Sequence, residues 1–439
     1  MIINAIYDST LSSAPAGFQS AVQAAIAFYD TTIKNNITVN ITFSSVPTSP
    51  GDIANSGYNY NFYSYSSVVT ALQQHDASIP ALAGAPFPAT DPFTGAGGNL
   101  AINELEAAAL GLRSTTTVAN GSCTLSSSDL WNFSSTTPSV AGQFNAVTAL
   151  EHEISEVLGR TCGSDGSMLA SPMAMFRYTA SGAVDTSSSY AGAYFSVDGG
   201  RTNLGQIGEQ GGDLADWGSA VKNDPFGFAT AGQADPISPT DLLALDALGY
   251  QVGPAQTTYN GANTEVFQGA LSQYQVTSGG ASIVVTDTVA NRDGTTSLSS
   301  IQQVKFSDVT LVFDLNSAED TLVYELYQAA FARTPDNVGF RYWATTGDSS
   351  HLSAISLADA FLAAPEFTQK YGSNPSNTAY VTALYSNVLG RSPDAAGLAY
   401  WISQANAGEA RDQLLAAFAT SQENVNLIAP HISNGFWTT

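Results

Sequence analysis

The spacing of apolar positions predicts alternating helices and strands over the first part of the chain. Between residues 14 and 34, apolar side chains recur every three or four positions, which is typical of an amphipathic helix. Residues 37–43 alternate apolar and polar side chains instead, which predicts a strand. Two further runs, 67–74 and 102–112, indicate helices, and the Gly-, Ser-, Thr- and Pro-rich segments between them are expected to be loops.

Two more helices are expected further along the chain. The apolar run 144–150 continues into residues 151–160, and Gly159 is a natural end for that helix. The segment between Pro239 and Gly249 carries a proline at its first turn and a glycine just past its end, which are helix start and stop signals. The Gly-, Ser- and Asp-rich chain between these two helices is expected to be irregular.

The last part of the chain is expected to be helical and internally repeated. Seven residues recur at a constant spacing of 58 positions. They are Tyr327, Arg333, Pro335, Asp336, Gly339, Tyr342 and Trp343, answered by Tyr385, Arg391, Pro393, Asp394, Gly397, Tyr400 and Trp401. Two such units are expected to stack their apolar faces, with Arg-x-Pro-Asp forming a turn between helices and the Tyr-Trp pair packing in the core.

These elements predict an α+β fold class with three parts. Residues 251–320 contain short apolar segments and tight turns, which predict a connector of short strands. The α+β domain that precedes the connector is expected to span residues 1–250, and the all-α repeated domain residues 321–439. Within the latter, the repeat units are expected at about 327–367 and 385–424.

Composition narrows the classes of partner. The chain has 439 residues, of which 37 are acidic and 13 basic, so the formal net charge is −24. Such a surface repels nucleic acid and anionic lipid, and no run of apolar residues is long enough to span a bilayer. Acidity also allows calcium to bind through oxygen ligands, although it equally serves only to keep a Gly- and Ser-rich protein soluble.

Targeting and redox signals leave alternatives open. The first eight residues lack the basic start and apolar core of a signal peptide. The protein is therefore expected to be cytoplasmic, to have lost such a signal, or to be exported through a signal at its other end. The two cysteines, Cys123 and Cys162, are too few for a disulfide framework, and whether they form one bridge stays open.

The candidate chemistry lies in the helix expected at 151–160. His152 and Glu156 are four residues apart, so on a helix their side chains share one face and can bind one metal ion. Glu153 is placed to take a proton from a water molecule that the metal activates. A zinc hydrolase needs three protein ligands and one open position. The third ligand is left open among Cys162, Asp165, Asp198, Asp213 and Asp216.

Two alternatives accompany this zinc site. An oxygen-rich ligand set suits zinc but also admits manganese or iron. A purely structural interpretation pairs Glu156 with Arg160 at four-residue spacing, which stabilises a helix by ~0.2–0.5 kcal/mol, and makes His152 a core histidine. Arg160 and Arg177 are each able to anchor a buried carboxylate.

The motif resembles the active-site helix of the metzincin metallopeptidases, whose pattern is His-Glu-x-x-His-x-x-Gly-x-x-His. His152, Glu153 and Gly159 match it, whereas Glu156 and Cys162 stand at the second and third ligand positions. The full motif, His-Glu-Ile-Ser-Glu-Val-x-Gly-Arg, looks more like that of a bacterial group of secreted metallopeptidases in which Glu is usual at the second ligand position. That resemblance covers roughly residues 1–250, and its other matching segments are 176–178, 194–200 and 212–217.

This resemblance implies a metzincin-like fold, with a sheet edge along which a peptide lies and a methionine turn beneath the metal. Met173 or Met175 fits that turn, although either is equally a core residue. The segment 284–313 resembles β segments that follow catalytic domains in proteins exported by bacterial type I secretion. The repeated domain resembles a domain of unknown function, related to phycobilisome linkers, that lies near the C-terminus of many such proteins.

The expected function is therefore a secreted zinc-dependent endopeptidase that hydrolyses protein or peptide substrates. His152 and Glu156 are the expected metal ligands and Glu153 the expected catalytic residue. The alternative is an inactive surface, adhesion or matrix-assembly protein built on a degenerate peptidase scaffold, with cell-surface or matrix components as partners of its repeated domain.

Overall fold

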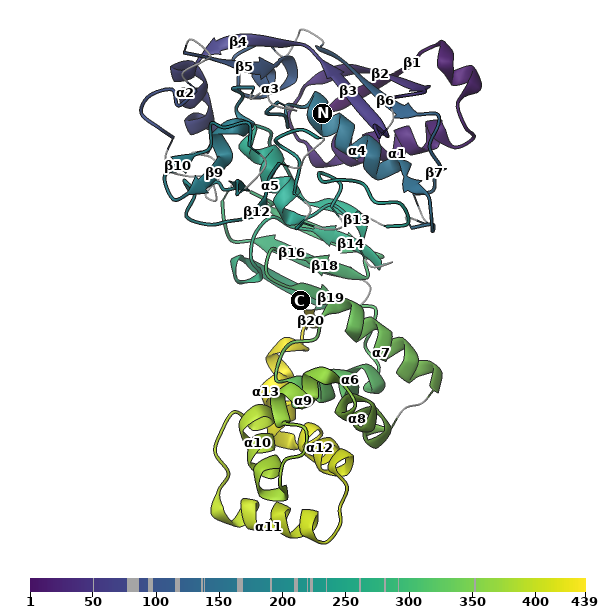
Figure 1. Ribbon diagram of the computed structural model, residues 1–439, viewed down its shortest axis with the longest axis vertical. Helices are drawn as coiled ribbons and strands as arrows, with labels where there is room; N and C mark the ends of the chain where they lie inside the picture. Colours follow the sequence, from purple (N-terminus) through teal and green to yellow (C-terminus); the bar gives the residue numbers. More distant parts are fainter. Residues whose placement is uncertain are drawn as a thin grey trace. The chain divides into compact units, whose positions relative to one another are not determined.

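The computed structural model divides into two compact units, each described here by itself (Figure 1). The first comprises Met1–Gln275 and Val285–Thr296, and the second Val276–Val284 and Ser297–Thr439. Not described are residues 50, 77–86, 94–97, 115–118, 136, 138, 164–168, 190–191, 209–211, 219, 222–223, 234, 260–261, 280–281, 291 and 351–352, and the side chains of 76 and 347–350. Helices and sheets are both present, which confirms the α+β class, and the connector expected at 251–320 contributes to both units.

The first unit is built on a four-stranded sheet with the order β1-β2-β6-β3 (Figure 1). Strands β1 (Ile2–Tyr7), β2 (Thr38–Val46) and β6 (Ala119–Ser126) run parallel. Strand β3 (Ala54–Tyr58) runs antiparallel to β6 and forms one edge. Every second side chain of β2 is buried, which is the alternation that predicted this strand.

Two helices carry most of the packing of this unit. Helix α1 (Phe18–Thr32) packs against helix α4 (Ala146–Val157), and α4 also packs on β3 and β6. The Tyr29 hydroxyl of α1 donates to the backbone oxygen of Glu151 in α4 at 2.5 Å. The predicted amphipathic helix and the predicted motif helix are therefore both confirmed, and they share one core.

The helix expected at 102–112 is wrong at its start. Strand β5 (Asn99–Asn103) pairs with β4 (Tyr60–Ser64) in antiparallel fashion, and only then does helix α3 (Glu104–Ala109) begin. The side chain of Asn103 accepts from the Leu105 backbone at 2.8 Å and caps α3. Apolar runs of this length suit a buried strand as well as a helix, and the pairing with β4 decides between them.

The remaining elements of the first unit include a sheet of short strands, with the order β10-β9-β11-β12, in the Gly-, Ser- and Asp-rich chain that was expected to be irregular. Helix α2 (Tyr65–Asp76) matches the run expected at 67–74, and helix α5 (Pro239–Ala247) follows a capping box at Ser238. The others are η1 (Ser9–Ser13), β7 (Trp131–Asn132), β8 (Phe144–Asn145), η3 (Met173–Phe176), β9 (Arg177–Ala180), β10 (Ala183–Val184), β11 (Tyr194–Phe195), β12 (Gly205–Gln206), β13 (Ala255–Tyr259), β14 (Ala262–Val266) and η4 (Leu271–Gln273).

The chain passes between the units in a run of strands, namely β15 (Tyr274–Gly279), β16 (Ser282–Asp287) and β17 (Thr295–Ser299). In the second unit, β18 (Gln303–Lys305), β19 (Thr310–Val312) and the C-terminal β20 (Phe436–Thr438) form antiparallel pairs. Short strands were expected in the connector. No pattern in the sequence predicted β20, which follows the repeated helices and pairs with β19.

The second unit contains two successive sets of four helices, drawn from green to yellow in Figure 1. The first set is α6 (Ala318–Phe331), α7 (Asn337–Ser350), α8 (Ala354–Leu362) and α9 (Pro365–Tyr371). The second is α10 (Asn377–Leu389), α11 (Ala395–Asn406), α12 (Arg411–Ala419) and α13 (Gln422–Ile428). Helix α6 packs on α10 and α12, and α8 packs on α12, so the two sets stack as the repeat predicted.

Each repeat is closed by an arginine–glutamate pair. Arg333 donates through Nε to Glu366 at 2.7 Å, and Arg391 donates in the same way to Glu423 at 2.5 Å. In both repeats the arginine lies in the turn between the first two helices and the glutamate in the first turn of the fourth. These pairs fix the same corner of each repeat.

One expectation for the repeats is wrong. Tyr342 and Tyr400 do not pack in the core, because they are 60% and 55% exposed. Their neighbours Trp343 and Trp401 are half-buried and contact the rings of Phe361 and Phe418. Adjacent residues of a helix point about 100° apart, so only one member of each pair faces inward.

Among the described residues, no helix is long and apolar enough to cross a bilayer.

Candidate metal centre

Helix α4 is defined at both ends by local interactions. Asn145 caps its start, because its side-chain oxygen accepts from the backbone of Val147 at 2.9 Å. At its end Gly159 adopts a φ of +115°, a conformation that L side chains rarely reach. A Cβ there would also lie 2.9 Å from the carboxylate of Glu106. The expectation that the motif helix ends at Gly159 is confirmed.

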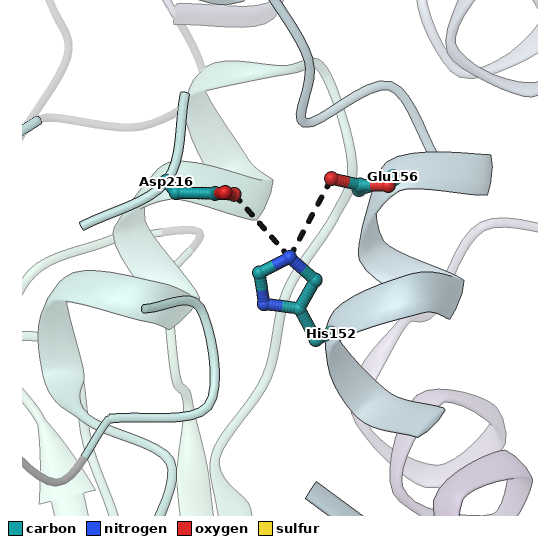
Figure 2. Close-up of side chains that lie close together, drawn as sticks. All are labelled: His152, Glu156 and Asp216. Atoms are coloured by element: carbon teal, nitrogen blue, oxygen red, sulfur yellow. Dashed lines mark ion pairs between the residues drawn. The ribbon is translucent and has the colours of Figure 1, made fainter. Parts of the chain in front are cut away.

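Three side chains converge beside this helix. His152 and Glu156 lie one turn apart on α4, and Asp216 reaches them from the loop that precedes Trp217 (Figure 2). The Nε2 atom of His152 is 3.5 Å from Glu156 Oε1 and 3.3 Å from Asp216 Oδ1. The three candidate ligand atoms all lie within 4.8 Å of one another. The structure thus brings the two predicted metal ligands together with one of the five third-ligand candidates.

A backbone carbonyl sets the orientation of the imidazole. His152 Nδ1 lies 2.8 Å from the oxygen of Pro225, which can only accept, so Nδ1 carries a proton. This arrangement turns Nε2 toward Glu156 and Asp216, and it is the usual support of a metal-binding histidine. Burial and Arg160 lower the pKa of His152, but Asp216 and Glu156 outweigh them and raise it well above its ordinary value.

Arg160 is the main structural support of the cluster. Its fully buried guanidinium donates through Nη1 to Asp216 Oδ1 at 2.9 Å and through Nε to Ser155 Oγ at 2.6 Å. Its Nη2 lies 3.0 Å from His152 Nε2 and 3.9 Å from Glu156 Oε1. The expected pairing of Arg160 with Glu156 is therefore the longest of these contacts, and Asp216 is the principal partner.

Glu156 is tied to the edge of the sheet as well. The Ser56 hydroxyl of β3 donates to Glu156 Oε2 at 2.6 Å, which leaves Oε1 on the side of His152. Side chains of His152 and Glu156 are 16% and 14% exposed, while that of Asp216 is 5% exposed. His152 and Glu156 are therefore more accessible to solvent than Asp216.

Trp217 positions the loop that carries Asp216. Its indole donates to Asp241 Oδ1 at 2.7 Å, and its backbone nitrogen donates to the Phe226 oxygen at 2.9 Å. Asp213 braces the same loop by accepting from the backbone of Cys162 at 2.8 Å and of Ala215 at 2.7 Å. Asp213 is therefore a backbone brace, and Asp216 is the residue that the loop presents to His152.

The acidic groups around the cluster have divergent pKa values. Burial raises the pKa of Asp216, but His152 and Arg160 outweigh it and lower that pKa to about 2. Burial, Asp216 and Glu156 raise the pKa of Asp213 to about 8. Burial and Glu156 raise the pKa of Glu153 well above its ordinary value. The Oε2 atom of Glu153 is buried and has no hydrogen-bond partner within the described part of the chain.

The other third-ligand candidates lie elsewhere or are engaged. Asp198 accepts from Ser196, Arg201 and Thr202 within its own turn. Asp165 lies outside the described residues. Cys162 is buried, is not bridged to the equally buried Cys123, and has its thiol pKa raised by burial.

Further residues singled out from the sequence have structural roles. Arg177 is fully buried and pairs with Asp185 at 2.9 Å, so it anchors a carboxylate other than Glu156. Met173 and Met175 are both fully buried in the core of the first unit. His75 contacts helix α5, because its Nε2 lies 3.1 Å from the backbone oxygen of Asp246. His431 stacks on Trp437, and His351 lies outside the described residues.

Sequence reasoning missed three supports of the site: Ser56, Pro225 and the Asp216–Arg160 pair. No residue spacing or motif identifies the Ser56 hydroxyl or the Pro225 carbonyl, because serine hydroxyls and backbone carbonyls occur throughout the sequence. The pair had a partial signal, since Arg160 is one of few basic residues in an acid-rich chain.

Comparison with known families covers only the repeated helices. A family model described as "Domain of unknown function (DUF4214)" matches residues 358–428, which run from α8 to α13. No curated protein and no solved structure matches the chain. The matched segment contains none of the residues of the metal centre.

Proposed function

We propose that the first unit is a zinc-dependent endopeptidase of metzincin-like type, with His152, Glu156 and Asp216 as metal ligands. The spacing of the ligand atoms carries this proposal. In a tetrahedral zinc site with ligand distances of about 2.0–2.2 Å, neighbouring ligand atoms lie about 3.3–3.6 Å apart. The two distances from His152 Nε2, 3.3 and 3.5 Å, agree with that edge length.

The donor set also fits a divalent cation. One imidazole and two carboxylates form a ligand set that zinc accepts, and they leave a fourth position for water or substrate. Four carboxyl groups, those of Glu156, Asp216, Asp213 and Glu153, lie in the field of Arg160 and of one another within this cluster. Such an excess of acidic groups in a buried place is stabilised by additional positive charge.

Glu153 is the proposed general base. A bound zinc supplies Lewis-acid chemistry, which lowers the pKa of a water molecule and polarises a carbonyl. Glu153 lies in the field of His152, Glu156 and Asp216 without being one of the three clustered ligands. Its unpaired buried Oε2 is therefore available to accept a proton from an attacking water and to return it to the leaving amine.

Strand β3 supports a peptide as the substrate. It is an edge of the sheet, and outside its pairing with β6 its backbone makes no hydrogen bond to the described residues. An extended peptide can add to such an edge through main-chain hydrogen bonds. The hydrogen bond from Ser56 to Glu156 would then hold the peptide bond to be cleaved beside the metal ligands.

The experiment that tests this proposal is the metal content of the full chain, purified without chelator and measured by elemental mass spectrometry. About one zinc per chain is expected, and it should be lost in His152→Ala. His431→Ala, which removes a histidine of the second unit, is the matched control and should keep the metal. Absence of zinc in the native chain after incubation with zinc contradicts the proposal.

The contact of Arg160 with His152 favours a second candidate. A guanidinium 3.0 Å from Nε2 occupies the side of the imidazole that a metal needs. In that case the first unit is an inactive scaffold, and its second unit carries adhesion or matrix assembly. A native chain that takes up no zinc, yet keeps its fold, supports this candidate.

Secretion through the C-terminal part is proposed on the sequence resemblance alone. Removal of residues 320–439 is expected to leave the first unit inside the producing cell. Fractionation of cells and medium measures this, and secretion of the truncated chain contradicts it.

A further inference from the structure

A second polar site lies in the first unit, beside α4 but apart from the metal centre. A cavity of about 360 Å³, open to solvent on one side, is lined by α1, Ser135, Asn145 and the first half of α4, residues 235–236 and the β13–β14 hairpin. Its lining includes Glu151 and Asp235 but none of His152, Glu156 and Asp216. Two carboxylates thus face a space that the proposed catalytic chemistry does not use.

Both carboxylates are buried and uncompensated. Glu151 is 9% exposed and Asp235 is 4% exposed. Among the residues that the structure describes, neither side chain accepts a hydrogen bond or joins an ion pair, and Glu151 lies in the field of Asp235 and Asp241 without any nearby cation. Burial without a counter-charge disfavours an ionised carboxylate, so a bound cation would stabilise the charged form of this pair.

The remaining polar groups of the lining define what that partner is. Besides the two acids, the polar residues of the lining carry hydroxyls or amides, and no histidine, cysteine, lysine or arginine is among them. The polar lining residues are Thr31, Ser135, Asn145, Thr148, Gln256, Thr257, Thr258 and Asn263. Carboxylate, hydroxyl and amide oxygens select hard cations such as calcium and magnesium over zinc or copper. The volume also holds several waters, each of which takes up about 30 Å³.

We propose that Glu151 and Asp235 anchor a calcium ion in this cavity. Calcium accepts six to eight oxygen ligands in flexible geometry, whereas magnesium requires a near-ideal octahedron. The lining comes from five separate segments, which suits calcium better. The ion ties α1 and α4 to residue 235 and to the β13–β14 hairpin, so it stabilises the fold on the side of α4 away from the substrate edge.

This site does not depend on the proposed peptidase activity. Because the ion binds the folded chain and not the unfolded one, calcium should raise the thermal unfolding temperature in a concentration-dependent manner. The full chain, freed of metals with a chelator and then dialysed, is titrated with calcium chloride alone. Isothermal titration calorimetry should give about one calcium per chain.

Variants separate this site from other acidic surface. Asp235→Asn and Glu151→Gln should each weaken calcium binding at least tenfold and abolish the thermal shift. Asp52→Asn removes an exposed acid of the same unit and should leave both unchanged. His152→Ala should lose zinc but keep calcium, so failure of either site is distinguishable from failure of the other.

Three outcomes overturn the proposal. One is a native chain whose unfolding temperature does not respond to calcium. Another is a calcium response that persists unchanged in Asp235→Asn, since that isosteric variant keeps the shape of the cavity. The last is an equal response to magnesium, which overturns the assignment to calcium. Circular dichroism of each variant confirms that the fold is retained.

Discussion

Arg160 donates through Nη1 to Asp216 Oδ1 at 2.9 Å, and both side chains are almost fully buried. The pair joins the end of the motif helix to a loop more than fifty residues away, and it carries Asp216 to within 3.3 Å of His152 Nε2. Ring stacking of the guanidinium over Phe226, at 4.9 Å, adds to the pair. The candidate metal centre is therefore held together by an arginine as well as by the three proposed ligands.

Removal of Arg160 should destabilise the first unit. Arg160→Met leaves Asp216 buried without a partner, and breaking one side of a buried ion pair costs about 3–5 kcal/mol. Urea denaturation of the full chain, with the two units followed as separate transitions, measures this. Arg391→Met, which breaks an exposed arginine–glutamate pair of the second unit, is the control and should change stability little. Equal effects of the two substitutions would contradict the role given to Arg160.

The same substitution distinguishes support of the metal from competition with it. If Arg160 positions Asp216, Arg160→Met should weaken zinc binding by about 10–100-fold, as loss of a residue that orients a ligand usually does. If its guanidinium occupies the place of the metal, zinc affinity should rise instead. Competition with a chromophoric chelator measures the zinc affinity, and an increase would favour the second candidate, in which the first unit is an inactive scaffold.

Glu153→Gln should abolish cleavage while keeping the fold and the metal. Glutamine has the shape of the glutamate side chain but cannot take up a proton, and burial, which raises the pKa of Glu153, already disfavours a charge at this position, so the fold should tolerate the amide. Loss of the base should lower the rate by about 10²–10⁴-fold. Glu106→Gln is a matched control, because Glu106 is equally buried and has an unpaired oxygen but lies outside the cluster. Unchanged hydrolysis of a peptide substrate by Glu153→Gln would refute the mechanism.

The sequence predicts the parts of this site that depend on neighbouring residues, but not those that depend on residues far apart in the chain. His152 and Glu156 were identified because helical spacing is local and α4 has caps at both ends. Asp216 could only be one of five candidates, since a loop closed by Trp217 and Asp241 brings it back to the helix. Local periodicity contains nothing about such a return.

The same limit explains the errors in the fold. Residue Ile102 was assigned to a helix because its apolar run suits either element, and only pairing with β4 makes it a strand. The repeats were found because their spacing in the sequence is constant. The exposure of Tyr342, however, depends on how the helices pack against one another. Patterns within a segment are predictable, whereas partners across the chain are not.

The metal-free chain should lose stability as the pH rises from about 4 to 8. The pKa of Asp213 is raised from 3.8 to about 8, by burial first, and burial raises that of Asp246 to about 6. Between the unfolded and folded values the folded state binds more protons than the unfolded state, so the free energy of unfolding falls with pH. Asp216 acts in the opposite sense, but only below its unfolded value of 3.8.

Urea denaturation of the chelator-treated chain at several pH values measures this dependence. Asp213→Asn removes one of the titrating groups and should flatten the slope between about pH 4 and 8. Asp52→Asn, at an exposed position, should leave the slope unchanged. Stability that rises over this range in the metal-free chain would show that these carboxyl groups are ionised when folded.

In the repeats, Gly339 should not tolerate a side chain. A Cβ at this position would lie 2.1 Å from the Tyr327 hydroxyl, and the equivalent Cβ at Gly397 would lie 2.2 Å from that of Tyr385. Overpacking of this kind costs about 1–3 kcal/mol, which exceeds the gain of roughly 1 kcal/mol from replacing a helical glycine with alanine. Gly339→Ala should therefore lower the urea midpoint of the second unit.

The double variant Gly339→Ala with Tyr327→Phe is the decisive comparison. Phenylalanine removes the hydroxyl that the new methyl group meets, so most of the lost stability should return. The same pair of substitutions at Gly397 and Tyr385 should behave alike, because the two repeats share this contact. If Tyr327→Phe gives no relief, the glycine is required for a reason other than the hydroxyl above it, such as the Asp336 carboxylate that lies 2.8 Å from the same Cβ.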